Sequence, residues 1–392
     1  MISGRLGCGT VRTYPKKMNK NPEDKVAEAF GRTSDPLEVY NEEMKQIDVD
    51  WYDRYLKTRI PKKDIAGSFA KKYQEAFDQW SEFMQRAYPE REPTLASHHH
   101  VEAWIEELTE RMNGDSARKL VNRVAEVYEW MQEDSRFPHP DEYNPYELAK
   151  KNNEGPLKSP DTREFPKLDI HDLRKQVAGI KHVGERAATV FGVKTGARPG
   201  EIGNLRFEDV HVTNADVLNH YNGEGQDHDQ MGSHPQLEGR PNAVFIDTKK
   251  NRPGNKRKNP TVIPLDDEMR RVLIDWLLIR PDNGSPWVFL TQKGGQMNPS
   301  NLQYVWRKHW WPEYQITNDD QKRSISPHWA RHWFSSWFRL EARMPEPWVQ
   351  YMRGDVQSSE VDNTRDAFHR YIHVEYEHIE DEYREKVFSL NL

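Results

Sequence analysis

The segment SPHWARHWF spans residues 326–334 and predicts a helix that begins after its Ser-Pro pair. His328 and Arg331 are three residues apart, so on a helix they share one face. This spacing places a titratable imidazole beside a guanidinium group that stays charged. Taken alone, the same pattern also fits a buried histidine followed by an exposed arginine.

The segment TGARPGEI, residues 195–202, predicts a sharp turn between two helices. Its two glycines and its proline interrupt one helix, and a new helix continues through Leu205. Arg198 stands in this turn. When the segment is considered by itself, a structural ion pair with Glu201 or Glu208 accounts for Arg198.

Two short apolar runs, residues 243–246 and 261–265, predict β-strands on either side of a basic turn. The turn holds six cations within ten residues and no acid among them: Lys249, Lys250, Arg252, Lys256, Arg257 and Lys258. A cationic hairpin tip suits the phosphate backbone of a nucleic acid, whose polyanionic field supplies most of the affinity. A solvated turn without a partner is the alternative.

The segment HRYIHV, residues 369–374, contains one candidate nucleophile, Tyr371. A tyrosine hydroxyl has an ordinary pKa near 10, so it becomes a good nucleophile only where neighbouring groups stabilise the phenolate. The chain has 16 tyrosines, and composition alone singles out none of them.

In this order the four segments resemble the tyrosine recombinases, the family of lambda-type phage integrases and chromosome-dimer resolvases. The family's first box reads roughly T-G-x-R-x-x-E-(I/L)-x-x-L, and its second reads H-x-L-R-H-(T/S)-F. The matching residues are Arg198, Glu201 and Leu205 in the first box and His328, Arg331, His332 and Phe334 in the second. The Tyr-x-His pattern at Tyr371 fits the family's last motif.

Two features depart from the family pattern. Asp355 stands where the family's Leu-Gly-His turn usually has a histidine that hydrogen-bonds the scissile phosphate. A carboxylate there would repel a phosphate unless it is protonated or paired, for instance with Arg353 or an active-site arginine. The alternatives are that Asp355 orients an arginine, or that His332 or a tryptophan is the donor. The interval between Asp355 and Tyr371 is also longer than usual. This leaves Tyr376 as an alternative nucleophile, although the Tyr-x-His-Val context favours Tyr371.

The resemblance implies a mainly α-helical fold with a small β-sheet. An N-terminal helical core-binding domain of the SAM-like type would precede a C-terminal α+β catalytic domain. Apolar periodicity and a Pro-rich stretch place the boundaries. The expected parts are an extension over residues 1–50, interpreted as a disordered tail, the core-binding domain over 51–150, a linker over 151–166 and the catalytic domain over 167–392.

The resemblance also implies that the chain cuts and rejoins DNA through a 3′-phosphotyrosyl intermediate, without a metal, a cofactor or ATP. Tyr371 would attack, Arg198 and Arg331 would clamp the phosphate, and His328 would assist proton transfer. Lys249 is the expected general acid, with Lys250 and Lys256 as alternatives. Asp355 completes the expected catalytic set, and the expected DNA-binding residues are Lys250, Arg252, Lys256, Arg257, Lys258 and His332. The implied partners are double-stranded attachment or recombination sites, held two at a time by a homotetramer.

Two other functions remain open at this point. A type IB topoisomerase-like enzyme would use the same chemistry to relax DNA without strand exchange. A catalytically inactive DNA-binding protein of the same fold is allowed by the change at Asp355. The separate helical domain and the short C-terminus favour a recombinase over a topoisomerase. Retention of Arg198, His328, Arg331 and Tyr371 argues against an inactive protein, so we expect an active recombinase, most simply an integrase of a virus or another mobile element.

Composition sets the remaining limits. The chain has 392 residues, a net charge of -6 and one cysteine, Cys8, which excludes an internal disulfide and a cysteine-based zinc site. The run His98-His99-His100 predicts no metal site, because consecutive residues are expected to point to different sides and no second ligand set has zinc spacing. No apolar stretch is long enough for a membrane span. These limits predict a soluble intracellular protein, and the resemblance implies the cytoplasm of a prokaryotic host, where the protein would be associated with the nucleoid.

Overall fold

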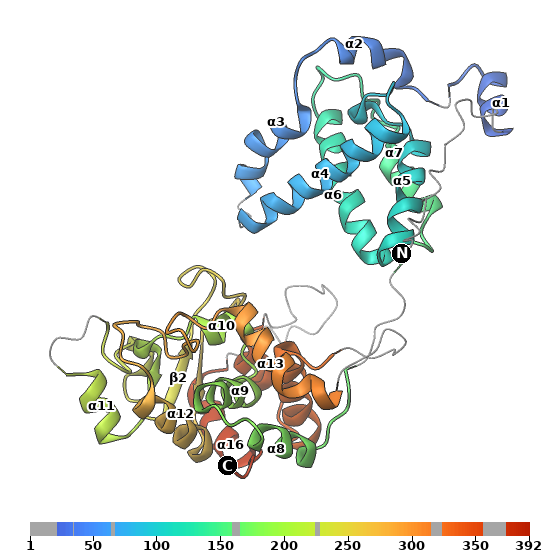
Figure 1. Ribbon diagram of the computed structural model, residues 1–392. Coiled ribbons are helices and arrows are strands. Elements are labelled where there is room, and N and C mark those ends of the chain that lie inside the picture. The colour runs from blue at the N-terminus through green and yellow to red at the C-terminus, as the bar shows by residue number, and fades with distance from the viewer. Residues whose placement is uncertain are drawn as a thin grey trace, which may run out of the picture. The chain divides into compact units, whose positions relative to one another are not determined.

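The computed structural model describes residues 22–33, 35–63, 67–158, 165–223, 228–314, 324–355 and 374–392. The chain divides into two compact units, Met1–Thr162 and Arg163–Leu392, and each is described by itself (Figure 1). The division falls within residues 151–166, for which the sequence predicts a linker. Among the described residues, no helix is both long enough and apolar enough to cross a membrane.

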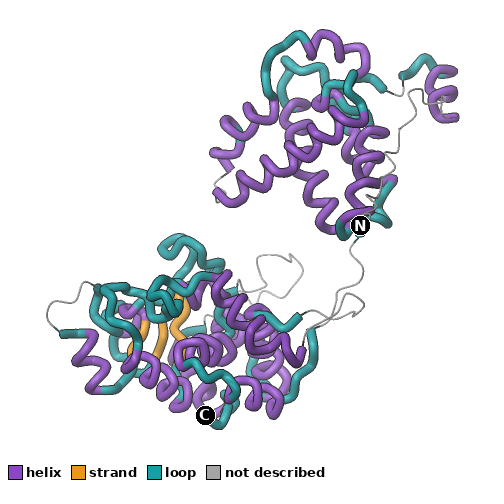
Figure 2. Tube along the Cα trace, in the orientation of Figure 1, coloured by secondary structure: helices purple, strands orange, loops and turns teal. Residues whose placement is uncertain are grey.

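The described residues of the N-terminal unit form helices that are joined by loops and turns (Figure 2). Its helices are α1 (Pro22–Ala29), α2 (Asn41–Lys45), α3 (Trp51–Thr58), α4 (Gly67–Ala87), α5 (His98–Arg111), α6 (Gly114–Gln132) and α7 (Pro145–Asn152). Apolar residues recur at helical spacing in α4, α5 and α6, which pack against one another, and α5 and α6 also pack against α7. Trp80 and Trp104 meet at the centre of this core, with ring centroids 4.9 Å apart and no exposed surface. Burial of such large rings is a major part of the stability of a small helical domain.

Two ends of this unit differ from the expectation. Leu37 and Met44 are buried in the core, and Arg91 forms an ion pair with Asp35 at 2.8 Å. The interpretation of residues 1–50 as a disordered tail is therefore wrong for the part from Asp35 to α2, while residues 1–21 lie outside the described residues. Leu157 is buried in the same core, so the N-terminal part of the predicted linker belongs to this unit.

The C-terminal unit is mainly helical with a small sheet, as predicted. Its helices are α8 (Ile170–Ala178), α9 (Val183–Thr195), α10 (Pro199–Gly203), α11 (Ala215–Tyr221), α12 (Asp267–Ile279), α13 (Pro299–Tyr314), α14 (Pro327–Ser336), α15 (Glu346–Arg353) and α16 (Tyr376–Lys386). Its strands are β1 (Val210–His211), β2 (Ala243–Ile246) and β3 (Thr261–Pro264).

Helix α9 is the centre of this unit and contacts α8, α10, α12, α13 and α14. Every residue from Ala187 to Thr195 is buried, which is the pattern of a helix surrounded by protein on all sides. Because α9 is fixed from all directions, the turn that follows it is held in a defined position.

The sheet is antiparallel in the order β1-β2-β3, and Val244 pairs with Val210 on one side and with Ile263 on the other. Alternate residues of β2 face different cores. Val244 and Ile246 belong to the main core, whereas Ala243 and Phe245 belong to a smaller cluster that includes Tyr376 of α16. This two-sided burial explains why β2 reads as an unbroken apolar run.

Candidate active site

The turn after α9 owes its shape to the residues of the first box. Gly196 has φ of 63° and ends α9 in the left-handed conformation, where a Cβ would lie 2.7 Å from the Phe334 ring. Arg198 precedes α10, and Pro199 is its first residue. The Glu201 carboxylate accepts hydrogen bonds from the Arg198 backbone N–H at 2.9 Å and from Nη1 at 3.1 Å. The box thus holds both the backbone and the side chain of Arg198.

Helix α14 brings the second box to the same place. Arg331 is buried, with 2% of its side chain exposed. Its Nη1 donates to the Gly196 carbonyl at 2.9 Å, and its Nη2 donates to the Arg353 carbonyl at 3.0 Å. Arg331 therefore joins the turn after α9 to the end of α15. Burial, together with the positive charge of Arg198, lowers the pKa of Arg331 to about 9.

Asp355 lies between the arginines that these two boxes supply. Its Oδ1 accepts from Arg198 Nη2 at 3.0 Å and from Arg331 Nη2 at 2.6 Å. Its Oδ2 lies 2.8 Å from Nε of Arg353. The sequence analysis expected this carboxylate to be paired with an arginine, and it is paired with three. One of them, Arg353, was not among the predicted site residues.

A buried ion pair lies beneath this cluster. Arg257 Nη2 is 3.2 Å from Glu201 Oε2, and neither side chain has any exposed surface. Arg257 Nη1 donates to the Met352 carbonyl at 2.9 Å. Burial lowers the pKa of Arg257, and the Glu201 carboxylate acts against this by raising it. Arg257 was expected to bind DNA, and its burial contradicts this role in the described conformation.

The cations of the basic segment between β2 and β3 therefore fall into two groups, one with side chains turned inward and one with side chains exposed. Arg252 turns inward to form ion pairs with Glu208 and with Asp209, the latter at 3.3 Å. Asn255 is buried and donates to the Asp247 carbonyl at 2.9 Å. The exposed cations of the segment are Lys249, Lys250, Lys256 and Lys258. The arginines shape the loop, and the lysines form its outer surface.

The two histidines of α14 lie on its exposed side. The rings of His328 and His332 are 4.9 Å apart, and Phe165 lies 4.5 Å from the His332 ring. Both histidines are exposed, so a ligand can reach them. The alternative for this segment was a buried histidine followed by an exposed arginine. The structure has the reverse, with His328 exposed and Arg331 buried.

Comparisons with known proteins identify the family. The model of the family described as "Phage integrase family" matches residues 167–378. The chain belongs to the phage integrase family. No curated protein sequence matches it significantly.

Solved structures of integrases share the fold. A lambda integrase tetramer bound to a Holliday junction has a TM-score of 0.55 and 14% identity, over 80% of this chain and 79% of that one. The Tn1549 transposon integrase in complex with circular intermediate DNA has a TM-score of 0.53 and 12% identity, over 83% of this chain and 95% of that one. At these identities the likeness concerns the fold, which is the one predicted.

The two candidate tyrosines differ in what the structure describes. Tyr371 lies outside the described residues. Tyr376, the alternative, begins α16 and is 2% exposed among Leu237, Phe245 and Val262. Burial raises the pKa of Tyr376, which makes its phenolate harder to form.

The histidine run in α5 does not lie as expected. The rings of His98 and His99 are 3.9 Å apart, so the expectation that they point to different sides was wrong. One ligand atom from each of His98, His99 and Glu102 lies within 4.8 Å of the others. His99 Nδ1 is 3.4 Å from the Glu102 carboxylate, and His98 Nδ1 is 3.2 Å from the Tyr143 hydroxyl. These contacts form a polar network, which explains why the three side chains lie close together.

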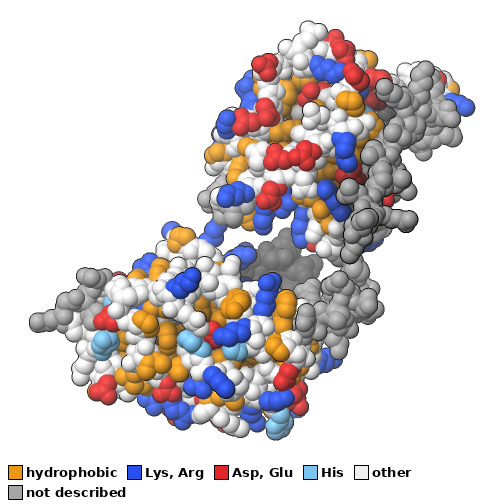
Figure 3. Space-filling view, in the orientation of Figure 1, with side chains coloured by type: hydrophobic (Ala, Val, Ile, Leu, Met, Phe, Trp, Pro, Cys, Tyr) orange, Lys and Arg blue, Asp and Glu red, His pale blue; other side chains and the backbone are white. Residues whose placement is uncertain are grey.

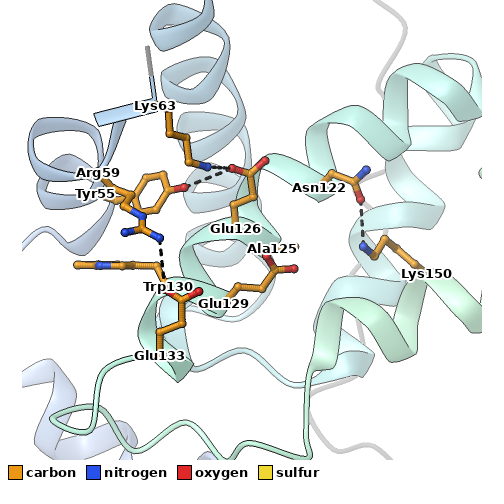
Figure 4. Close-up of a pocket in the computed structure, with 10 residues that line it drawn as sticks. All are labelled: Tyr55, Arg59, Lys63, Asn122, Ala125, Glu126, Glu129, Trp130, Glu133 and Lys150. Carbon is orange, nitrogen blue, oxygen red and sulfur yellow. Dashed lines mark hydrogen bonds and ion pairs between the residues drawn. The ribbon is translucent and has the colours of Figure 1, made fainter. Parts of the chain in front are cut away.

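A hollow of about 440 Å³ lies in the N-terminal unit, between α3, the turn that follows α3, and α6 (Figure 4). Three acids and three bases line it, and Glu126 pairs with Lys63 and Glu133 with Arg59. On the visible face of this unit, acidic and basic side chains are interspersed (Figure 3). The hollow therefore lacks the single-sign charge that would favour a charged ligand.

Proposed function

We propose that the chain is a site-specific DNA recombinase that cuts and rejoins DNA through a 3′-phosphotyrosyl intermediate. The observation that carries this proposal is the convergence of Arg198 and Arg331, from two distant segments, on one carboxylate oxygen. Guanidinium groups that share one anionic oxygen are arranged to hold an oxyanion such as a phosphodiester. Membership of the phage integrase family and the integrase fold support the reaction class.

In the proposed reaction Tyr371 attacks the scissile phosphate and forms a phosphotyrosyl bond, while the 5′-oxygen leaves. Arg198 and Arg331 stabilise the charge that develops on the non-bridging oxygens. His328 assists removal of the tyrosine proton, and Lys249 protonates the leaving oxygen. The phosphotyrosyl bond conserves the energy of the phosphodiester, so religation by a 5′-hydroxyl needs no ATP.

Burial of Tyr376 supports Tyr371 as the nucleophile, because a tyrosine enclosed on all sides cannot reach a DNA phosphate. Exposure of Lys249 and His328 supports their roles in proton transfer. Lys250, Lys256 and Lys258 would meet the phosphate backbone near the reacting strand, and exposed His332 would contact DNA beside His328.

We further propose that a homotetramer holds two DNA duplexes during exchange, as the lambda integrase tetramer bound to a Holliday junction suggests. The likeness to a phage integrase and a transposon integrase supports integration of a mobile element as the biological setting. The chain would then act where its DNA lies, on the chromosome of its host.

Trapping on nicked duplexes tests the proposal. A nick close to the cleavage site lets a short fragment diffuse away, so the covalent complex accumulates as an SDS-resistant band. Wild-type protein forms this band, Tyr371→Phe forms none, and Arg331→Ala reduces the rate of its formation about a hundredfold or more. The matched control is Tyr376→Phe, which keeps the buried ring and forms the band normally.

A plasmid with two sites separates the competing functions. A recombinase produces deletion or inversion products, whereas a topoisomerase-like enzyme only relaxes the plasmid. A protein that binds the duplex in a mobility assay and forms no covalent band is an inactive DNA-binding protein, and that result overturns the proposal.

A further inference from the structure

The acidic side chain at the centre of the cluster is held as a bound anion would be held. Asp355 receives Arg198 and Arg331 on Oδ1 and Arg353 on Oδ2, at 3.0, 2.6 and 2.8 Å. These arginines come from the start of α10, from α14 and from the end of α15. A carboxylate and a phosphodiester both present two equivalent oxygens that carry one negative charge, and guanidinium groups bind both in the same forked geometry.

The carboxylate also closes access to the more deeply buried arginine. Arg331 is 2% exposed while Asp355 is in place. Its two Nη atoms donate hydrogen bonds to the Gly196 carbonyl, the Arg353 carbonyl and the Asp355 carboxylate. A phosphate can bind Arg331 only if the Asp355 side chain is displaced from it.

We propose that Asp355 is an internal ligand, which occupies the position of the scissile phosphate in the DNA-free chain and leaves it when DNA binds. We propose also that Arg353 then becomes a third phosphate-binding arginine. This inference rests on the proposed function, because it assigns the cluster to the scissile phosphate.

Of the two acids in the cluster, Asp355 is the one able to leave. Glu201 has no exposed side-chain surface and binds Arg257 and Arg198 from below. The side chain of Asp355 is 27% exposed and lies next to Arg353, which is 32% exposed. With Asp355 displaced, Arg198, Arg331 and Arg353 offer positive charge to one phosphate, while Glu201 continues to balance Arg257.

Oxyanion binding to the DNA-free, full-length protein tests the inference. The probe is inorganic sulfate, compared with chloride at matched ionic strength, and the readout is thermal stabilisation as a function of concentration. Removal of a competing like charge is worth about one power of ten. Asp355→Asn therefore binds sulfate about tenfold more tightly than wild type, and adding Arg353→Gln to it reverses most of that gain. The control is Glu346→Gln, which removes one exposed acid from α15 and leaves sulfate affinity unchanged.

Equal or weaker sulfate binding by Asp355→Asn overturns the inference and makes Asp355 a residue that only positions the arginines. If that variant fails to fold, the structure of wild-type crystals soaked in sulfate tests the same inference. Sulfate between Arg198 and Arg331 with Asp355 turned away supports the inference, and sulfate excluded from that position contradicts it.

The DNA reaction separates this inference from the proposed function. In the nicked-duplex assay, Asp355→Asn reaches half-maximal covalent complex at a DNA concentration about tenfold below that of wild type. If wild type forms the complex and the variant shows no such shift, the inference alone fails. If sulfate affinity rises in the variant while neither protein forms a covalent complex, the proposed function fails and the anion site remains.

Discussion

Removal of the negative charge of Glu201 provides a stringent test of how the site is held together. Glu201→Gln keeps the size of the side chain and one carbonyl oxygen. The native carboxylate accepts from the Arg198 N–H, from Arg198 Nη1 and from Arg257 Nη2, and it is fully buried. After the substitution, Arg257 is a buried cation without its buried counter-charge, although its Nη1 still donates to the Met352 carbonyl.

The cost follows from this burial. Breaking a buried ion pair by removing one partner costs about 3–5 kcal/mol, because the other charge is left uncompensated. Exposed pairs contribute only about 0–1 kcal/mol, so the two classes are well separated in size. At about 1.4 kcal/mol for each factor of ten, the opening equilibrium of this region rises at least a hundredfold.

Hydrogen exchange with peptide resolution measures the effect in the full-length protein. We expect faster exchange in the peptides of α9, α10 and the loop from Asp247 to Pro260. Replacing both partners, Glu201→Gln with Arg257→Met, removes the buried charges together and restores much of the protection. The control Glu346→Gln removes an exposed acid and changes exchange by less than about twofold. A loss below about 1 kcal/mol in Glu201→Gln, or no recovery in the double variant, refutes the reasoning.

Three further results are expected. Lys256→Gln with Lys258→Gln lowers DNA affinity and reduces the salt dependence of binding by about two ion equivalents, with an unchanged melting temperature; an unchanged slope in fluorescence anisotropy titrations shows that these lysines do not meet phosphates. Burial lowers the pKa of His139 from 6.5 to about 4, so its stabilising effect is present above pH 6.5 and is lost as pH falls towards 4, by up to about 3 kcal/mol. Denaturant titrations across that window find that the free energy of unfolding depends less on pH in His139→Phe than in wild type. An equal dependence in both proteins would show that another group causes it. Gly354→Ala costs about 2–5 kcal/mol, since φ is 61° and the new Cβ would lie 2.3 Å from Cγ of Arg257; calorimetry that finds a smaller loss shows that the loop yields easily.

Much of the fold could be predicted from the sequence, because the features concerned are local. The apolar residues of α4, α5 and α6 recur at helical spacing, and β2 and β3 are short unbroken apolar runs. The turn at Gly196 and Arg198 also follows from local rules, since glycine takes the left-handed position and proline opens α10. These local rules could not predict that Leu37 packs into the core, because its partners are residues far along the chain.

The site was predicted less completely, for a similar reason. Six adjacent cations between β2 and β3 look equivalent in sequence, and only the positions of Glu208 and Glu201 show that Arg252 and Arg257 turn inward. The place of Glu201 in the first box was a usable signal for a structural acid beside Arg198. The sequence analysis named Arg353 as a possible partner of Asp355, two residues away, but gave no reason to count it among the residues of the site.

The identity of the residue that joins DNA is the most direct test of the account. Wild-type protein is trapped on nicked duplexes that are tiled across the replicon encoding it. The complexes are then digested with nuclease and protease and analysed by mass spectrometry. The account predicts one nucleotide-bearing peptide, with Tyr371 joined to a 3′-phosphate. A linkage to Tyr376, a linkage to a 5′-phosphate, or no covalent complex on any duplex would contradict it.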